Sequence, residues 1–202
     1  MSAELKDGSA TVKLIGGDWS LDFVDALYEW ETSYEHLLDW SRRAGLVVEQ
    51  KAQELEQEAA AHPDQAQAVL EQAISLRSLI HSIFWALAHG QEANSNDIAR
   101  LNALLPSVLS KQHVTREEGK FTWGWDEQSA GMDRMFWPII RSAAELLMNP
   151  DLQRLKACQG EGCDRLFLDL SRNYSRRWCD MEHCGMLVKS RRHYAKKRLA
   201  RA

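Results

Sequence analysis

Four cysteines, arranged as two pairs near the C-terminal end, constrain the fold more than any other feature of this sequence. The segments CQGEGC and CDMEHC each hold two cysteines with four residues between them, and 15 residues separate the pairs. Two thiolates two to four residues apart on a tight turn can occupy two corners of a tetrahedron, and a second pair supplies the other corners. The 202-residue chain contains no other cysteine. The spacing therefore predicts a four-thiolate metal site formed by Cys158, Cys163, Cys179 and Cys184.

Zinc is the metal that this pattern predicts, as one Zn²⁺ ion per chain in a structural role. Clustered cysteines in a reducing compartment indicate a metal site or catalysis more readily than disulfides. A closed set of four thiolates is typical of structural zinc, whereas a catalytic zinc keeps one position open for water. Two disulfides, an iron–sulfur cluster and inert buried thiols are the alternatives. His183 is the nearest substitute ligand, although we interpret it as an exposed residue of a turn.

The charges divide the chain into an acidic body and a basic end. Residues 151–202 hold 13 Lys and Arg against 6 Asp and Glu, a net charge of +7. Residues 1–150 hold the other 12 Lys and Arg against 23 Asp and Glu, a net charge of −11, so the whole chain carries −4. The last 18 residues hold seven of the cations and no acid. This asymmetry predicts that the C-terminal part approaches a polyanion.

The sequence shows no sign of export or membrane insertion. Its first 19 residues mix charges and glycines, where a signal peptide would need an apolar run. No stretch approaches the roughly 18 uninterrupted apolar residues of a membrane span. We therefore expect a cytoplasmic protein without a membrane partner, in a compartment that keeps thiols reduced.

Hydrophobic spacing predicts an α+β chain, in which residues 1–150 form a predominantly α-helical domain with a small β element and residues 151–202 form a treble-clef-like zinc finger. The first predicted helix starts near Ser20, and the second begins at a capping box of Thr32 and Glu35 and ends at Gly45. Further helices are expected at about 48–61, from Pro63 to about His89, and from Ser95 to just before Pro106. The last is expected at about 129–148, with Pro138 as a kink or boundary. The β element comprises a strand at about 10–14 and a hairpin over 111–125 whose turn holds Glu118 and Gly119. Asn149 should cap a short connecting helix over 150–156.

The finger itself should combine a short strand at 166–168, a turn at 169–173 and a helix after the last cysteine. At 100° per residue, apolar side chains fall on one side of this helix and cations on the other. The apolar side comprises Leu187, Val188, Tyr194, Ala195 and Leu199, and the basic side comprises Lys189, Arg192, His193, Lys196 and Lys197. Because so small a module cannot fold on a hydrophobic core alone, we expect its folding to depend on the metal, with a core separate from that of the helical domain.

These residues resemble a known family. The C-x4-C pair followed by LFLDLSRNYSRRWCDMEHCG is similar to the CGNR zinc finger over about residues 155–198. The segment LIGGDWSLDFVDAL and the helices after it resemble the ABATE domain that accompanies this finger in a family of stress-induced transcription regulators. The resemblance implies a bacterial, DNA-binding regulator. Met186 and Leu187 stand where the family has Asn and Arg, which removes any contact of that Arg with phosphate or base.

Two groups of cations are candidates for contact with DNA. Lys189, Arg192 and Lys196 form a ridge that could lie along phosphates. Arg172, Arg176 and Arg177, around Tyr174, could reach base edges. The alternatives are a solvated charged face and, for Arg176 and Arg177, stabilisation of the −2 charge of a zinc ion with four thiolates. A finger that serves as a protein-interaction or dimerisation module is the competing function, and a homodimer would also supply more base contacts.

The N-terminal domain offers weaker signals. The ABATE resemblance implies a sensing or assembly role, with a small-molecule effector that the sequence does not identify. His81, Trp85 and His89 share one face of a predicted helix and could hold a ligand, but packing is the more common role for such residues. Asp22 and Asp25 are expected to complement the dipole of the first helix. The sequence has no Gly-rich phosphate loop, nucleophile elbow or HExxH motif, so we expect no enzymatic activity.

Overall fold

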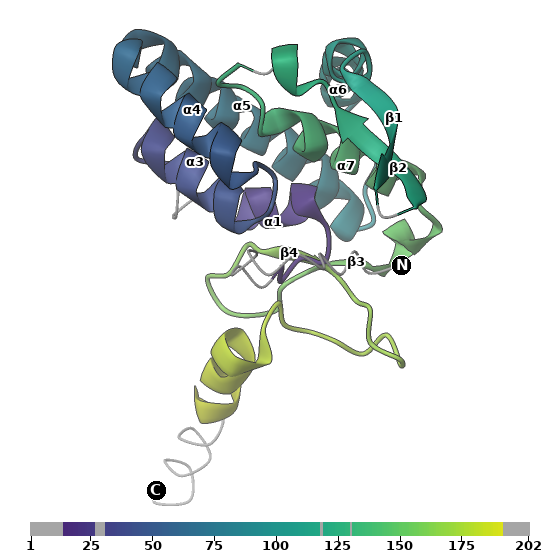
Figure 1. Cartoon of the computed structure of the whole chain (residues 1–202). Helices are drawn as coiled ribbons and strands as arrows, with labels where there is room; N and C mark the ends of the chain where they lie inside the picture. The colour runs from purple at the N-terminus through teal and green to yellow at the C-terminus, as the bar shows by residue number, and fades with distance from the viewer. Residues whose placement is uncertain (1–13, 27–30, 118, 130, 192–202) are drawn as a thin grey trace, which may run out of the picture.

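The computed structural model describes residues 14–26, 31–117, 119–129 and 131–191, and confirms a helical N-terminal domain with small sheets and a C-terminal four-cysteine module (Figure 1). The helices of the N-terminal domain are α1 (Trp19–Asp25), α3 (Tyr34–Arg43), α4 (Glu49–Ala61), α5 (Pro63–Ala88), α6 (Ser95–Leu109) and α7 (Phe136–Met148), with a 3-10 turn η1 (Glu127–Ser129). A hairpin of β1 (Gln112–Glu117) and β2 (Lys120–Trp125) lies between α6 and η1. The module that follows contains η2 (Pro150–Arg154), β3 (Leu155–Ala157), β4 (Leu166–Leu168) and the π-helical turn η3 (Met181–Gly185), and the chain is helical over 186–191.

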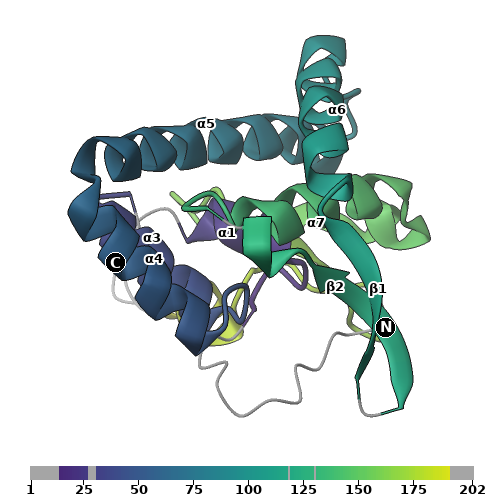
Figure 2. The same ribbon diagram turned by 45° about the horizontal axis from the view of Figure 1, so that its top comes forward.

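The core of the helical domain forms around α5, the longest helix. This helix packs against α1, α3, α4 and α6, and it also contacts β3. Figure 2 shows α5 crossing the domain and α6 turned across its C-terminal end. The largest fully buried side chains are Trp40, Trp137, Phe23 and Phe84, so aromatic residues supply much of the buried apolar area.

The helix boundaries show where local signals were sufficient. Ser33, rather than Thr32, caps α3, because its hydroxyl accepts a hydrogen bond from the N–H of His36 at 3.2 Å, so the predicted capping box is wrong. Gly45 follows the end of α3 with φ 72°, the left-handed conformation that the sequence suggested. Asn149 caps η2 as expected, its side chain accepting from the N–H of Asp151 at 2.8 Å. The predicted helix over 150–156 is too long, because it ends at Arg154 and residues 155–157 form β3. The strand expected at 10–14 lies outside the described residues except for residue 14, which is not in a strand.

Pro106 differs from its prediction as a helix end, whereas Pro138 takes one of its two predicted roles. Helix α6 does not stop before Pro106 but continues to Leu109, because the buried residues Leu101 and Val108 hold both sides of the proline against the domain. Helix α7 begins at Phe136 instead of near residue 129, and Pro138 lies in its first turn, where a missing N–H costs no intrahelical hydrogen bond. Pro138 is therefore a helix boundary rather than a kink.

The hairpin formed by β1 and β2 has the predicted register. Glu117 pairs with Lys120, and Gln112 pairs with Trp125 at the other end. Of the two residues predicted for the turn, Gly119 has a φ of 82°, and residue 118 lies outside the described residues. Trp125 lies 6.0 Å from Trp137 of α7, measured between ring centroids. Arg141 of α7 also lies over the Trp123 ring, with Cζ 5.2 Å from the centroid, whereas Phe121, farther along the hairpin, is 77 % exposed.

The β strands of the C-terminal module belong to the core of the helical domain. Strand β3 pairs antiparallel with β4, with Leu155 opposite Leu168, so the partner strand precedes the first cysteine pair instead of lying between the pairs. Leu155, Leu166 and Leu168 are buried in the same apolar cluster as the helices, whereas Phe167 points to a smaller cluster with the cysteines. The finger therefore has a buried cluster of its own around the cysteines, and its strands also contribute to the helical core, because alternate side chains of β4 face the two clusters.

Candidate metal centre

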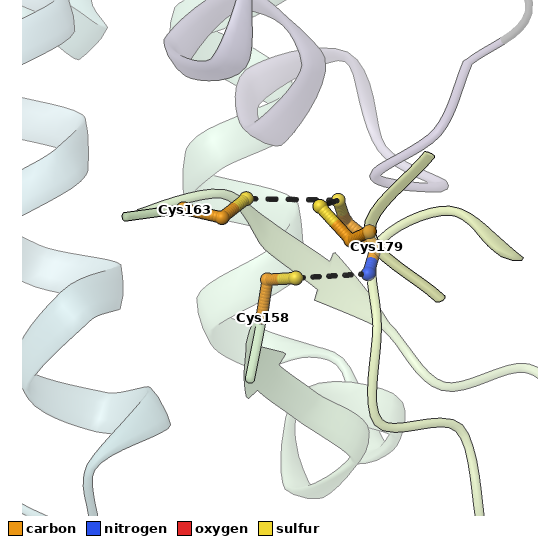
Figure 3. A group of neighbouring side chains, drawn as sticks. Cys158, Cys163 and Cys179 are labelled. Carbon is orange, nitrogen blue, oxygen red and sulfur yellow. Dashed lines mark hydrogen bonds between the residues drawn. The ribbon is translucent and has the colours of Figure 1, made fainter. Parts of the chain in front are cut away.

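Four short structural elements bring the cysteines together. Cys158 follows β3, Cys163 ends the turn after it, Cys179 follows the loop that leaves β4, and Cys184 lies in η3. Gly160 is required in the first turn, because a Cβ at this position would lie 3.1 Å from the Sγ of Cys184. Figure 3 shows the side chains of Cys158, Cys163 and Cys179 pointing toward one another.

The sulfur atoms have the spacing of a tetrahedral zinc site. All four lie within 4.8 Å of one another. The Sγ atom of Cys179 is 3.8 Å from that of Cys163 and 3.7 Å from that of Cys184. Zinc–sulfur bonds of about 2.3 Å in a tetrahedron require sulfurs about 3.8 Å apart, whereas a disulfide requires about 2.05 Å. The cluster is therefore able to hold one zinc ion, and the alternative of two disulfides does not fit it.

The surroundings of the cluster disfavour several thiolates at once unless a cation lies between them. Burial raises the pKa of Cys163 to about 12 and raises the pKa of Cys179 further, and the neighbouring Cys158 sulfur acts in the same direction. Burial alone would also raise the pKa of Cys158, but backbone N–H groups lower it overall. The N–H of Cys179 donates to the Cys158 Sγ at 3.3 Å, and that of Gly160 donates at 3.4 Å. Four adjacent thiolates thus need a metal ion to offset their charge, which Zn²⁺ supplies.

Comparison with protein families agrees with this geometry. The model of the CGNR zinc finger matches residues 154–197. The model of the ABATE family, described as "Putative stress-induced transcription regulator", matches residues 17–150, which is more than half of the chain. This chain belongs to the ABATE family. No curated protein matches the sequence. Hereafter the N-terminal part is called the ABATE domain and the four-cysteine module the CGNR finger.

Arg176 of the CGNR finger has a structural position rather than the exposed one expected of a base contact. Its guanidinium donates to the carbonyl oxygens of Trp178 at 3.0 Å and Ile15 at 3.1 Å, and also to that of Cys179. It also stacks on Phe167, with Cζ 4.3 Å from the ring centroid. The guanidinium therefore joins the loop before a zinc ligand to the chain that precedes α1. This use of its donors removes Arg176 from the predicted contacts with bases.

Asp169 organises the loop that carries the remaining candidates. Its carboxylate is fully buried, and it accepts hydrogen bonds from the Nζ of Lys156 at 2.5 Å and from the N–H groups of Ser171 and Arg176 at 3.0 and 2.9 Å. Burial would raise the pKa of Asp169, but Lys156 and the hydrogen bonds outweigh it and lower the pKa to about 2. The loop between Ser171 and Arg176 is thus closed at both ends by one ionised side chain.

The other predicted site residues have different surroundings. Arg172 and Arg177 are exposed on this loop, and the Nε of Arg177 donates to the Oε1 of Gln159 at 2.8 Å. Lys189 is exposed on the helical segment 186–191, whereas Arg192 and Lys196 lie outside the described residues. Sequence reasoning missed Arg191, which forms an ion pair with Glu161 between the terminal helix and the first knuckle. Of the expected apolar side of this helix, Leu187 is 57 % exposed.

Two acidic side chains of α1 accept hydrogen bonds from other segments of the chain, and that of Asp25 reaches the finger. Asp22 accepts from the N–H groups of Ile15 and Gly16 at 2.7 and 2.9 Å, and Asp25 accepts from the N–H of Leu166 at 3.2 Å. Burial raises the pKa of Asp22 to about 6 and that of Asp25 to about 8. Asp22 lies in the first turn of α1, as expected of a partner of the helix dipole, but Asp25 is the last residue of α1, so the expectation for Asp25 is wrong. Asp22 and Asp25 are three positions apart on the helix, and this spacing in the sequence indicates that the two side chains lie on the same face.

The aromatic face of α5 is packed rather than arranged around a ligand. The ring of Trp85 lies 5.2 Å from that of His81 and 4.4 Å from that of His89, and His89 Nδ1 is 2.8 Å from the Trp85 carbonyl oxygen. Within the described residues, the four cysteines are the only group of three or more potential metal ligands. No helix in that same part of the chain is long and apolar enough to cross a membrane.

Proposed function

We propose that this protein is a DNA-binding transcription regulator in which the CGNR finger contacts DNA and the zinc ion only holds the finger in shape. The observation that carries the proposal is the preorganised loop after β4. Buried Asp169 fixes both ends of this loop, while Arg172 and Arg177 remain exposed on it. A loop ordered before binding loses less conformational entropy when it meets its target. The net charge of +7 over residues 151–202 favours a polyanion as that target.

Two kinds of contact are assigned to the finger. Lys189, Arg192 and Lys196 would neutralise phosphates, which contributes affinity without sequence preference. Arg172 and Arg177 would contact base edges, where a guanidinium can donate two hydrogen bonds to guanine. Arg176 is left out because its donors are bound to backbone carbonyls.

The remaining assignments follow from the family. The ABATE domain would sense a small-molecule effector or mediate assembly, and the buried contacts between α1 and β4 would pass its state to the finger. The protein would act in the bacterial cytoplasm, where thiols stay reduced. It would have no catalytic activity, since a closed four-thiolate zinc leaves no position for a reacting water.

Binding of the zinc-loaded protein to a library of duplexes tests this function. We expect selection of a preferred sequence from the library, and loss of that preference in an Arg172→Gln, Arg177→Gln variant that keeps its zinc. Arg100→Gln with Arg116→Gln, two arginines of the ABATE domain, is the matched control. If the wild type binds no duplex at low salt, or if the loop variant retains the full preference, the assignment is wrong.

A second candidate function is a zinc-stabilised interaction or dimerisation module. Exposed apolar side chains favour it, since Met186 is 62 % and Leu187 is 57 % exposed where the terminal helix begins. In this case light scattering would show a homodimer that Met186→Ala with Leu187→Ala converts to a monomer. A monomeric wild type that binds DNA would exclude this alternative.

A further inference from the structure

A groove of about 600 Å³ lies between the C-terminal end of α5 and the CGNR finger. His89 lines one side, Lys156 and Gln159 belong to the stretch around Cys158, and Tyr174 and Arg177 line the finger loop. A volume of this size falls within the range of small-ligand sites in proteins, which is about 300–1,000 Å³. Cys158 of the metal centre and Arg177, a proposed DNA contact, also line the groove, but neither of these roles accounts for the groove itself.

Tyr174 has a strained backbone at the edge of this groove. Its φ of 51° is the only positive value among the described non-glycine residues. The Nζ of Lys156 donates to the Tyr174 carbonyl at 2.6 Å and also to the carboxylate of buried Asp169. The ion pair of Lys156 and Asp169 therefore stabilises the strained conformation of Tyr174. Such conformations persist where the surroundings enforce them, and they cluster at binding sites. Glycine or asparagine would adopt this φ more readily than tyrosine. A purely structural role of the loop therefore does not explain why tyrosine occupies the position.

The ring of Tyr174 is prepared for stacking. The guanidinium of Arg154 lies over the ring, with Cζ 4.6 Å from the centroid, and it donates to the phenolic oxygen at 2.6 Å. Arg154 does not line the groove, and Tyr174 nevertheless stays 52 % exposed. One face of the ring is therefore supported by a cation, while ring surface is left for a planar ligand.

The charges around the groove permit one anionic group. None of the lining residues is an aspartate or glutamate. Lys156 and Arg176 direct their donors to Asp169 and to backbone carbonyls. The exposed guanidinium of Arg177 donates through Nε to Gln159 and lies over the Trp178 ring, with Cζ 5.9 Å from the centroid. Asp169 and the thiolates of the metal centre offset much of the positive charge nearby. A single exposed guanidinium suits one phosphate better than a polyphosphate.

We propose that this groove binds a nucleotide unit, with the base stacked on Tyr174 and the phosphate at Arg177. Gln159 and Ser175 supply hydrogen-bonding groups for the edge of the base, and His89 closes the opposite side. The same chemistry is present in a free mononucleotide and in a nucleotide of a single strand. A base within a duplex is already stacked between its neighbours, so the groove would accept only an unpaired nucleotide. The inference therefore does not depend on duplex binding by the finger.

Calorimetric titration of the zinc-loaded full chain tests the proposal with four probes: adenosine 5′-monophosphate, adenosine, ribose 5-phosphate and a six-residue oligodeoxyadenylate. We expect the first to bind more tightly than adenosine or ribose 5-phosphate, because both stacking and the phosphate contribute. If the oligonucleotide binds and the mononucleotide does not, the ligand is a single strand of nucleic acid. If the mononucleotide binds and the oligonucleotide does not, the ligand is a free nucleotide. Equal binding of ribose 5-phosphate and the mononucleotide, or no binding of either nucleotide probe, would overturn the proposal.

Variants identify the residues. Tyr174→Gly removes the ring but suits the positive φ, so the protein should stay folded while nucleotide binding weakens about tenfold or more. Tyr174→Phe should retain most of the binding, and Arg177→Gln should lose the preference for the mononucleotide over adenosine. His113→Ala and Arg116→Gln, on the distant hairpin, should change nothing. Full binding by folded Tyr174→Gly would contradict the site. Duplex binding measured on the same samples separates this result from the fate of the proposed DNA function.

Discussion

The carboxylate of Asp25, at the end of α1, accepts a hydrogen bond from the backbone N–H of Leu166, the first residue of β4, at 3.2 Å. One partner belongs to the ABATE domain and the other lies between the two zinc-binding knuckles of the CGNR finger. A further backbone bond at 2.8 Å, from the N–H of Leu168 to the carbonyl of Gly16, lies beside it. The two parts of the molecule are therefore connected by buried polar contacts as well as by shared apolar packing, and this connection has measurable consequences.

The first consequence is a pH-dependent stability. Burial raises the pKa of Asp25 to about 8 from an ordinary value near 4, and raises that of Asp22 to about 6. The folded state therefore holds protons that the unfolded state releases, and the free energy of unfolding should fall as the pH rises from about 4 to 8. Asp25→Asn removes this titration, so we expect it to be more stable than the wild type at pH 8, by roughly 1–3 kcal/mol.

Urea unfolding at pH 5 and pH 8 measures the effect. The difference in stability between the two pH values should shrink in Asp25→Asn, whereas the exposed control Asp64→Asn should retain it. An Asp25→Asn protein whose stability falls with pH as steeply as that of the wild type would show that another group is responsible.

The second consequence concerns the metal. Cys179→Ser should lower the thermal stability of the ABATE domain as well as melt the finger, because Leu155, Leu166 and Leu168 contribute to the helical core. Each buried leucine stabilises a fold by about 1.5–3 kcal/mol, so detachment of the β3–β4 hairpin with its three buried leucines should remove roughly 4.5–9 kcal/mol. Circular dichroism at 222 nm, with elemental analysis of zinc, measures both changes.

The matched control for this variant is His183→Ala, which should keep one zinc per chain and the wild-type melting temperature. Proteolysis should attack the ABATE domain of Cys179→Ser faster than that of the control. A Cys179→Ser protein that has lost its zinc but retains the wild-type helical transition would show that the two parts fold independently.

The third prediction separates a structural arginine from an exposed one. Arg176→Gln leaves the carbonyls of Ile15, Trp178 and Cys179 without their donor, so we expect a loss of about 2–4 kcal/mol in stability. Arg172→Gln, four residues earlier on the same loop, should change stability by less than about 0.5 kcal/mol. Chemical denaturation of the two zinc-loaded variants gives the comparison. Equal stabilities would mean that the hydrogen bonds of Arg176 to these carbonyls do not stabilise the fold.

The sequence was sufficient where chemistry is local. The spacing of the cysteines predicted the cluster, and the apolar period of residues 63–88 predicted the core helix, because each signal lies within one or a few turns. Arg176 could not be assigned in this way, since its partners Ile15 and Cys179 lie on different segments that only the fold brings together. The same reason explains Asp25, whose partner Leu166 is 141 residues away. Pro106 misled the prediction because tertiary burial of Val108 outweighed a local helix-ending signal.

The salt dependence of DNA binding tests the central claim of a DNA-binding finger most directly. Each neutralised phosphate contributes about 0.9 to the slope of log affinity against log salt concentration. Removal of Lys189, Arg192 and Lys196 together, in a variant shown to retain one zinc per chain, should therefore weaken binding to every duplex and flatten the slope by about three units. A zinc-loaded triple variant with unchanged affinity and an unchanged salt slope would contradict the account.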